Sequence, residues 1–133
     1  MPFEDDCALA GDIEIVRVLV DRSWCTKNDD GTERPSSIAF LDSLNEVSCF
    51  ILNETNLSLI ADRFPDKKIA IVTVAAAREA GFIVARDPDG GGGIPGHVVL
   101  VQRSAPLESK QHVRLTRQLA KNGRVSGLSQ AAQ

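Results

Sequence analysis

One glycine-rich segment holds the residue types that could do chemistry. It reads ARDPDGGGGIPGHVVLVQ over residues 85–102, with Asp87, Asp89 and His97 around four consecutive glycines. Histidine is a common general acid/base because its ring changes charge close to neutral pH. His97 is therefore the candidate acid/base of a small hydrolase or ribonuclease. The group that assists it would be Asp87, Arg34, Ser36 or Ser37.

The same segment matches the pattern G-x-G-x-x-G at Gly91, Gly93 and Gly96. In dinucleotide-binding proteins these glycines lead into a helix whose N-terminus holds the pyrophosphate. Here Pro95 and the β-branched run HVVLV follow, which predicts a strand. We expect no nucleotide and no other cofactor, and we expect Gly90–Gly93 to be the mobile tip of a long hairpin.

The sequence gives little support to metal binding or to thiol chemistry. Asp87, Asp89 and His97 could ligate a cation, but ordering four glycines around it costs conformational entropy, so we predict no metal site. The three cysteines, Cys7, Cys25 and Cys49, form no C-x-x-C pair and are typical of reduced thiols in a cytoplasmic protein. Cys49 falls in an apolar strand, whereas Cys25 follows Trp24 in a loop and is a candidate nucleophile.

Charge is distributed unevenly along the chain. The net charge is −3, yet residues 103–133 carry six basic residues against the single acid Glu108. Four of them recur every three or four residues, which places them on one stripe of a helix: Lys110, Arg114, Arg117 and Lys121. Such a stripe can dock on an acidic partner or lie over an acidic face of its own domain. Because aromatic residues make up 5% of the chain, we favour a protein partner over nucleic acid.

The hydrophobic pattern predicts a single α+β domain over residues 1–123. We expect one mixed, mostly antiparallel sheet of about five strands, with two to three helices on one side of it. The segments predicted as strands are 12–21, 37–43, 46–52, 68–74, 82–87 and 97–102. The predicted helices are 54–64, 74–80 and 107–123, and residues 124–133 are expected to be a disordered tail.

Two blocks of the sequence resemble a group of small uncharacterised bacterial proteins. They are RPSSIAF (34–40) and IVTVAAAREAGFIVARDPDGGGGIPGHVVLV (71–101), which carry an Arg-x-Ser-Ser-x-Ala-Phe segment and an Ala-Arg-x-x-Gly…Asp-Pro…Pro-x-His block. The resemblance covers less than half of the chain and brings no activity or catalytic residue with it. It implies that one set of positions belongs together: Ser36, Ser37, Asp87, Pro88, Pro95 and His97.

These observations rank two functions. The first is a small non-catalytic accessory or regulatory protein of the cytoplasm, which binds a macromolecular partner through the basic helix or the glycine loop around His97. No apolar run is long enough to cross a membrane, and a homodimer is a further option. The second is the hydrolase or ribonuclease that uses His97. A preformed pocket with His97 against Asp87 would favour the enzyme.

Overall fold

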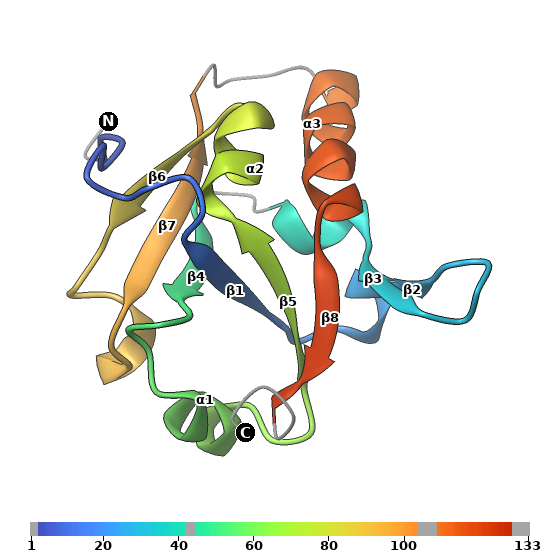
Figure 1. Ribbon diagram of the computed structural model, residues 1–133, viewed down its shortest axis with the longest axis horizontal. Helices are drawn as coiled ribbons and strands as arrows, with labels where there is room; N and C mark the ends of the chain where they lie inside the picture. Colours follow the sequence, from blue (N-terminus) through green and yellow to red (C-terminus); the bar gives the residue numbers. More distant parts are fainter. Residues whose placement is uncertain (1–2, 42–44, 104–108, 129–133) are drawn as a thin grey trace.

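The computed structural model describes residues 3–41, 45–103 and 109–128. Its main feature is a six-stranded sheet in which every pair of neighbours is antiparallel. The strands are β1 (Glu14–Leu19), β4 (Val47–Ile51), β5 (Lys68–Thr73), β6 (Phe82–Arg86), β7 (His97–Gln102) and β8 (Arg124–Gly127). They are ordered β6-β7-β4-β1-β5-β8 (Figure 1). The α+β prediction is therefore confirmed, with six strands in the main sheet instead of about five.

A small hairpin stands beside this sheet. It consists of β2 (Cys25–Lys27) and β3 (Glu33–Pro35), joined by a turn in which Gly31 has a φ of 88°. Glycine adopts this left-handed conformation without a steric penalty, and the pair Asp30-Gly31 is typical of such turns. The hairpin projects from the molecule beyond β8 (Figure 1).

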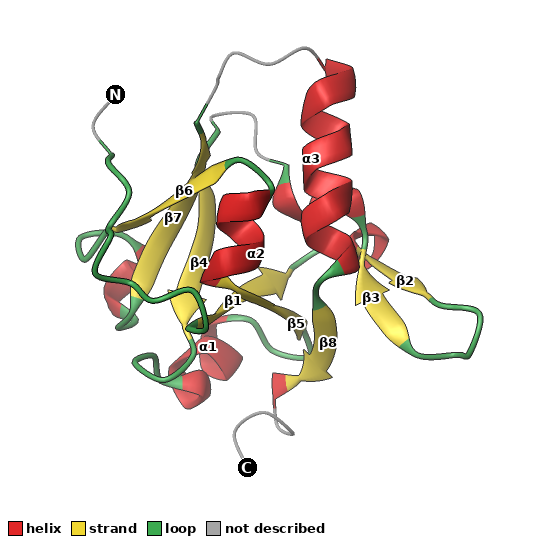
Figure 2. Cartoon of the chain, turned by 45° about the horizontal axis from the view of Figure 1, so that its top comes forward, coloured by secondary structure: helices red, strands yellow, loops and turns green. Residues whose placement is uncertain are grey.

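The sheet is covered on both faces. Helices α2 (Val74–Glu79) and α3 (Ser109–Lys121) lie side by side over one face (Figure 2), where Ala77 and Leu119 join the larger apolar cluster. Helix α1 (Leu57–Arg63) covers the opposite face, where its Ile60 packs in the cluster that contains Val16. The expectation that all helices lie on one side is thus wrong for α1. Residues on both faces of the central strands are apolar, so both faces must be shielded from water.

A polar side chain caps the N-terminus of each of the two short helices. The Asn56 side chain accepts hydrogen bonds from the N–H groups of Ser58 and Leu59 at the start of α1. The Thr73 hydroxyl accepts one from the Ala76 N–H at the start of α2. Both side chains satisfy N–H groups that have no partner within the helix.

The described part of the strand predicted over 37–43 is not a strand. Ser37–Phe40 is instead a short 3-10 helix, η2, whose Ala39 and Phe40 are buried in the cluster beneath α3. A run of four apolar or small residues is too short for its period to distinguish a strand from a helical turn. Residues 42–44 lie outside the described part of the chain.

The predicted disordered tail is also corrected. Arg124–Gly127 forms β8, which pairs with β5 from Ile71↔Arg124 to Lys68↔Gly127. The sequence RVSG carries no clear alternation, but the edge of β5 offers backbone groups that any residue can pair with. Residues 129–133 lie outside the description. None of the described helices is long and apolar enough to cross a membrane.

Candidate active site

Three polar residues meet on the sheet face that α1 covers. Ser48 belongs to β4, His97 is the first residue of β7, and Asp87 follows β6 directly. In the β4–β7 register His97 pairs with Phe50 and Ser48 with Val99, so Ser48 and His97 are diagonal neighbours on one face. The Asp87 N–H donates to the His97 carbonyl, 3.0 Å away, which holds the two residues side by side.

The geometry of the three side chains is that of a nucleophile, a base and an orienting group. The Ser48 Oγ lies 2.5 Å from the His97 Nε2. On the other side of the ring, the His97 Nδ1 lies 2.9 Å from the Asp87 carbonyl oxygen and 3.4 Å from its carboxylate Oδ2. A carbonyl oxygen can only accept, so the proton of the neutral ring resides on Nδ1. The bare Nε2 then accepts from the Ser48 hydroxyl, as a general base must.

The glycine loop packs directly on this histidine. The His97 side chain is 5% exposed. A Cβ atom on Gly90 would lie 2.7 Å from both Cε1 and Nδ1 of His97, and one on Gly91 would lie 3.0 Å from the Cβ of His97 and from the Phe50 ring. Glycine is therefore required here by close approach as well as by the φ of 76° at Gly91. Gly90 and Gly91 thus cover one side of the ring, whereas Gly92 and Gly93 are exposed.

Ser48 hydrogen-bonds to this enclosed ring and also lines a pocket of about 260 Å³. The pocket walls combine aromatic rings, two valines and two guanidinium groups. Its lining residues are Arg17, Val18, Val20, Trp24, Ser48, Phe50, Arg63, Phe64 and Gly91. A single hydrogen bond thus joins the buried His97 ring to the Ser48 hydroxyl at the pocket wall.

Arg17 holds the backbone of Ser48 in place. The β1–β4 ladder ends at Val16↔Phe50, so beyond this pair β1 no longer bonds to β4. The Arg17 side chain takes over this role, since its Nη1 donates to the Ser48 carbonyl at 3.0 Å and its Nε to the Ala39 carbonyl at 2.9 Å. Its guanidinium carbon also lies 4.8 Å from the centre of the Trp24 ring, a cation–π contact.

The serines predicted from the sequence lie elsewhere. Ser36 donates to the Ser23 carbonyl at 2.7 Å, and Ser37 begins η2, which packs against α3. The described hydroxyl that bonds to His97 is that of Ser48, which sequence reasoning missed. Its signal was a lone hydroxyl in the apolar strand VSCFI, just as Arg17 is the one charge inside the run IVRVL. Of the grouped positions, Asp87 and His97 meet, whereas the prolines 88 and 95 are exposed.

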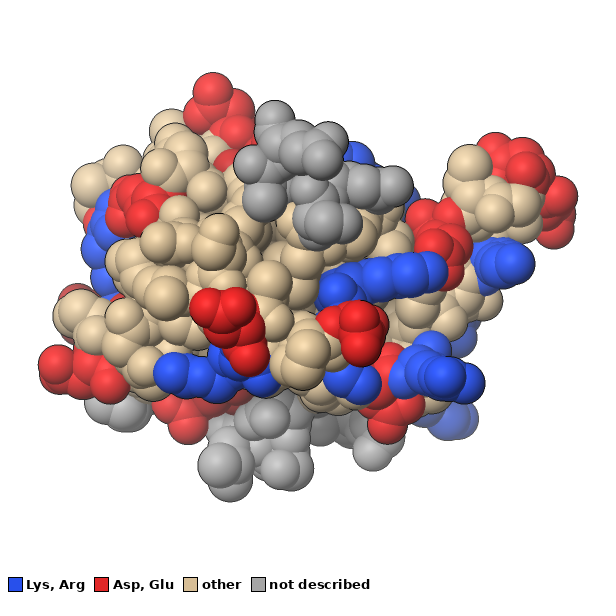
Figure 3. Space-filling model, turned by 90° about the horizontal axis from the view of Figure 1, so that it is seen from below, with Lys and Arg blue, Asp and Glu red and all other residues tan. Residues whose placement is uncertain are grey.

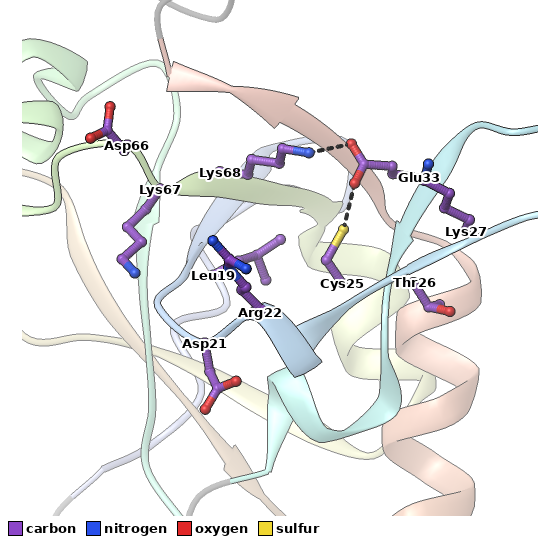
Figure 4. Close-up of a pocket in the computed structure, with 10 residues that line it drawn as sticks. All are labelled: Leu19, Asp21, Arg22, Cys25, Thr26, Lys27, Glu33, Asp66, Lys67 and Lys68. Carbon is purple, nitrogen blue, oxygen red and sulfur yellow. Dashed lines mark hydrogen bonds and ion pairs between the residues drawn. The ribbon is translucent and has the colours of Figure 1, made fainter.

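A second pocket, of about 670 Å³, lies between the β2–β3 hairpin and the start of β5 (Figure 4). It contains Cys25, whose thiol donates to the Glu33 carboxylate at 3.1 Å, while Lys68 donates to the other oxygen of Glu33 at 2.6 Å. Burial and the hydrogen bond to Glu33 raise the pKa of Cys25. The thiol therefore stays protonated at neutral pH, which argues against Cys25 as a nucleophile.

The basic stripe lies on the outer side of α3. All four of its members, Lys110, Arg114, Arg117 and Lys121, are exposed. Within the described part of the chain none of the four forms an ion pair. The inward side of the same helix is buried through Thr116, Leu119 and Ala120. The stripe therefore lies on a different surface from the Ser48 pocket, because α3 covers the opposite face of the sheet.

Comparisons with known proteins add no candidate. No protein-family model, curated protein or solved structure gives a significant match to this chain. In residues 3–41, 45–103 and 109–128, no group of three or more His, Cys, Asp or Glu side chains is placed to hold a metal ion.

Proposed function

We propose that the protein is a small hydrolase in which Ser48 is the nucleophile and His97 the general base. The observation that carries this proposal is the 2.5 Å contact between Ser48 Oγ and His97 Nε2 at the wall of a preformed pocket. The sequence ranked a non-catalytic binding protein first. The pocket and the approach of His97 to Asp87 support the hydrolase instead, because a base oriented on its far side is what nucleophilic catalysis requires.

The reaction follows from the positions of the protons. Ser48 Oγ attacks the carbonyl carbon of an ester and its proton passes to His97 Nε2. The bond to the leaving alcohol then breaks, and the alcohol oxygen takes that proton, which leaves an acyl group on Ser48. Water attacks the acyl carbon and gives a proton to Nε2, and the proton returns to Ser48 as the acid departs. The Asp87 carboxylate, 3.4 Å from Nδ1, stabilises the ring while it is positively charged.

Ester or amide hydrolysis fits the site better than RNA cleavage. RNA requires a continuous positive surface along its phosphates. The face seen from below carries Lys and Arg side chains interleaved with Asp and Glu side chains (Figure 3). The pocket is also small, about 260 Å³, and accommodates a single ring or a short acyl chain.

Labelling with a fluorophosphonate probe tests this function. An activated serine displaces fluoride from such a probe, so that an O–P bond forms, the P–F bond breaks and HF is released. We expect the intact mass of the wild-type protein to increase by one adduct, located on Ser48 by peptide mapping. Ser48→Ala should remove the adduct and His97→Gln should slow it by at least a hundredfold.

Ser58→Ala is the matched control, since Ser58 is an exposed serine on α1 that faces no histidine among the described contacts. It should label at the wild-type rate. A folded wild-type protein that gains no adduct, or gains it equally in Ser48→Ala, would overturn the proposal.

A second function is supported by the basic stripe of α3. We propose that Lys110, Arg114, Arg117 and Lys121 dock on an acidic surface of a protein partner, because all four are exposed without an ion pair to any described residue. Two such stripes repel each other, so a homodimer would have to form through another surface. We place the protein in the bacterial cytoplasm, where its three free cysteines stay reduced.

Affinity capture with two baits tests the docking surface. One bait is the wild-type chain and the other replaces the four basic residues with glutamine. A protein that the wild type retains, the variant loses and the purified wild type rebinds with strong salt dependence would support docking. Equal retention by both baits would contradict it.

A further inference from the structure

Arg17 is a half-buried cation without a counter-ion among the described residues. Its Nε and Nη1 donate to backbone carbonyls, and its Nη2 donates to no described residue. Charged groups that lose part of their hydration are normally paired. Because Arg17 lines the Ser48 pocket, the unpaired positive charge is available to whatever enters that pocket.

A second guanidinium lies on the wall of the same pocket. Arg63, the last residue of α1, donates from Nη2 to the Gly92 carbonyl at 2.8 Å and from Nη1 to the Gly91 carbonyl at 3.5 Å. These contacts orient the guanidinium toward the glycine loop that covers His97. It also forms no ion pair with a described carboxylate.

The other lining residues provide a surface for a ring or a short apolar chain. Trp24, Phe50 and Phe64 are aromatic, and Val18 and Val20 add aliphatic surface. Within the described residues, no acidic side chain lines the pocket. Two cations and no acid in the described lining, beside an apolar wall, are complementary to a small molecule with one apolar part and one oxyanion.

We propose that the substrate of the Ser48 site carries an oxyanion group, a carboxylate or a phosphate, that binds between Arg17 and Arg63. The inference rests on the proposed hydrolase for its reaction and adds the substrate class. Each guanidinium has five N–H donors and uses two of them on the backbone carbonyls described above, so the others can donate to either kind of oxyanion. The apolar part of the substrate lies against the aromatic wall, which leaves the scissile bond facing Ser48.

Direct binding of three probes tests the substrate class. The probes are benzoate, phenylphosphonate and neutral benzyl alcohol, titrated into the wild-type protein and into Ser48→Ala while amide chemical shifts are followed. We expect benzoate or phenylphosphonate to bind at least tenfold more tightly than benzyl alcohol, in both proteins. Which of the two anions binds more tightly distinguishes a carboxylate substrate from a phosphate substrate.

Arg63→Gln removes one of the two cations from a position on the surface of α1. It should weaken binding of the anions about tenfold and leave benzyl alcohol unchanged. Arg114→Gln is the control, because it removes one positive charge from α3 on the other side of the sheet. It should change neither the binding of the anions nor that of benzyl alcohol. Arg17→Lys keeps the positive charge but replaces the planar guanidinium by a single ammonium group. It should weaken binding of the two anionic probes while the chain stays folded.

The two proposals fail in different ways. Equal affinity for charged and neutral probes, or no binding of any probe to a protein that still labels at Ser48, would overturn the anionic substrate and leave the hydrolase standing. Anion binding that depends on Arg63, in a protein that fluorophosphonate does not label, would overturn the hydrolase and leave the anion site standing.

Discussion

A Cβ atom on Gly90 would lie 2.7 Å from the Nδ1 of His97. The same atom would also overlap the Asp87 carboxylate. A side chain at residue 90 would therefore meet both His97 and Asp87, the residue that orients its ring. Any side chain at this position must displace the imidazole, the carboxylate or the loop.

Gly90→Ala should lower the free energy of unfolding by about 1–3 kcal/mol, the usual cost of an overpacked side chain. The φ of −89° at Gly90 suits alanine, so the cost comes from contact and not from backbone strain. Because the added Cβ would meet both His97 and Asp87, the rate of fluorophosphonate labelling should fall as well. Urea unfolding and labelling kinetics measure the two effects.

Gly93→Ala is the matched control within the same loop. A Cβ atom there meets nothing within 4 Å, but its φ of 88° strains alanine. It should cost about 1–2 kcal/mol of stability without slowing the labelling. Equal loss of labelling in the two variants would show that general loosening of the loop, not contact with His97, is the cause.

The protonation of the His97 ring can be observed directly. With Nδ1–H donated to the Asp87 carbonyl, we expect an NMR spectrum of the neutral ring to show a protonated Nδ1 and a bare Nε2. Ser48→Ala should shift the Nε2 resonance and leave Nδ1 nearly unchanged. A His112→Gln background removes the signals of the only other histidine. A proton on Nε2 would contradict the proposed direction of the hydrogen bond.

Cys49 should make stability depend on pH in the alkaline range. Burial raises the pKa of Cys49 to about 12 from an ordinary value of 9.0. Above about pH 9 the unfolded chain releases this proton and the folded chain retains it, so alkali favours unfolding. The stability difference between wild type and Cys49→Ala should therefore fall by up to about 1.4 kcal/mol per pH unit between these two values. A pH-independent difference would show that the thiol is accessible.

Asp5 should make stability depend on pH in the acid range, with stability falling as the pH falls. Partial burial raises the pKa of Asp5, but the hydrogen bond from the Val84 N–H and the contacts with Arg78 outweigh it, so the net pKa is lowered. The stabilisation is then present above about pH 4 and is lost as the pH falls through the lowered value. Asp5→Asn should cost about 1 kcal/mol at neutral pH and remove this acid dependence, as measured by urea unfolding at several pH values.

Glu4→Gln is the control for Asp5, because it removes a neighbouring charge that has no described ion pair. It should change stability by less than about 0.5 kcal/mol. Val84 lies in the edge strand β6, so Asp5 also satisfies a backbone N–H that would otherwise be open. A similar loss in both variants would point to net charge and not to this contact.

Local sequence signals predicted most of the elements, because their causes are local. The caps at Asn56 and Thr73, the Asp-Gly turn before Thr32 and the apolar strands follow from neighbouring residues alone. The errors have a shared cause. Residues 37–40 became η2 and residues 124–127 became β8 because packing against α3 and pairing with β5 supplied what the short segments lack.

In the candidate site, too, some contacts follow from neighbouring residues and others from strand pairing over long separations. The sequence by itself determined that His97 and Asp87 would be close, since a hairpin joins them, and that Gly90–Gly93 would permit unusual backbone. Ser48 and Arg17 come from strands 49 and 80 residues away in the chain from His97. Only the register of β4 with β7 and the end of the β1–β4 ladder bring them to one pocket. Strand pairing depends on backbone hydrogen bonds over long separations, which no local pattern specifies.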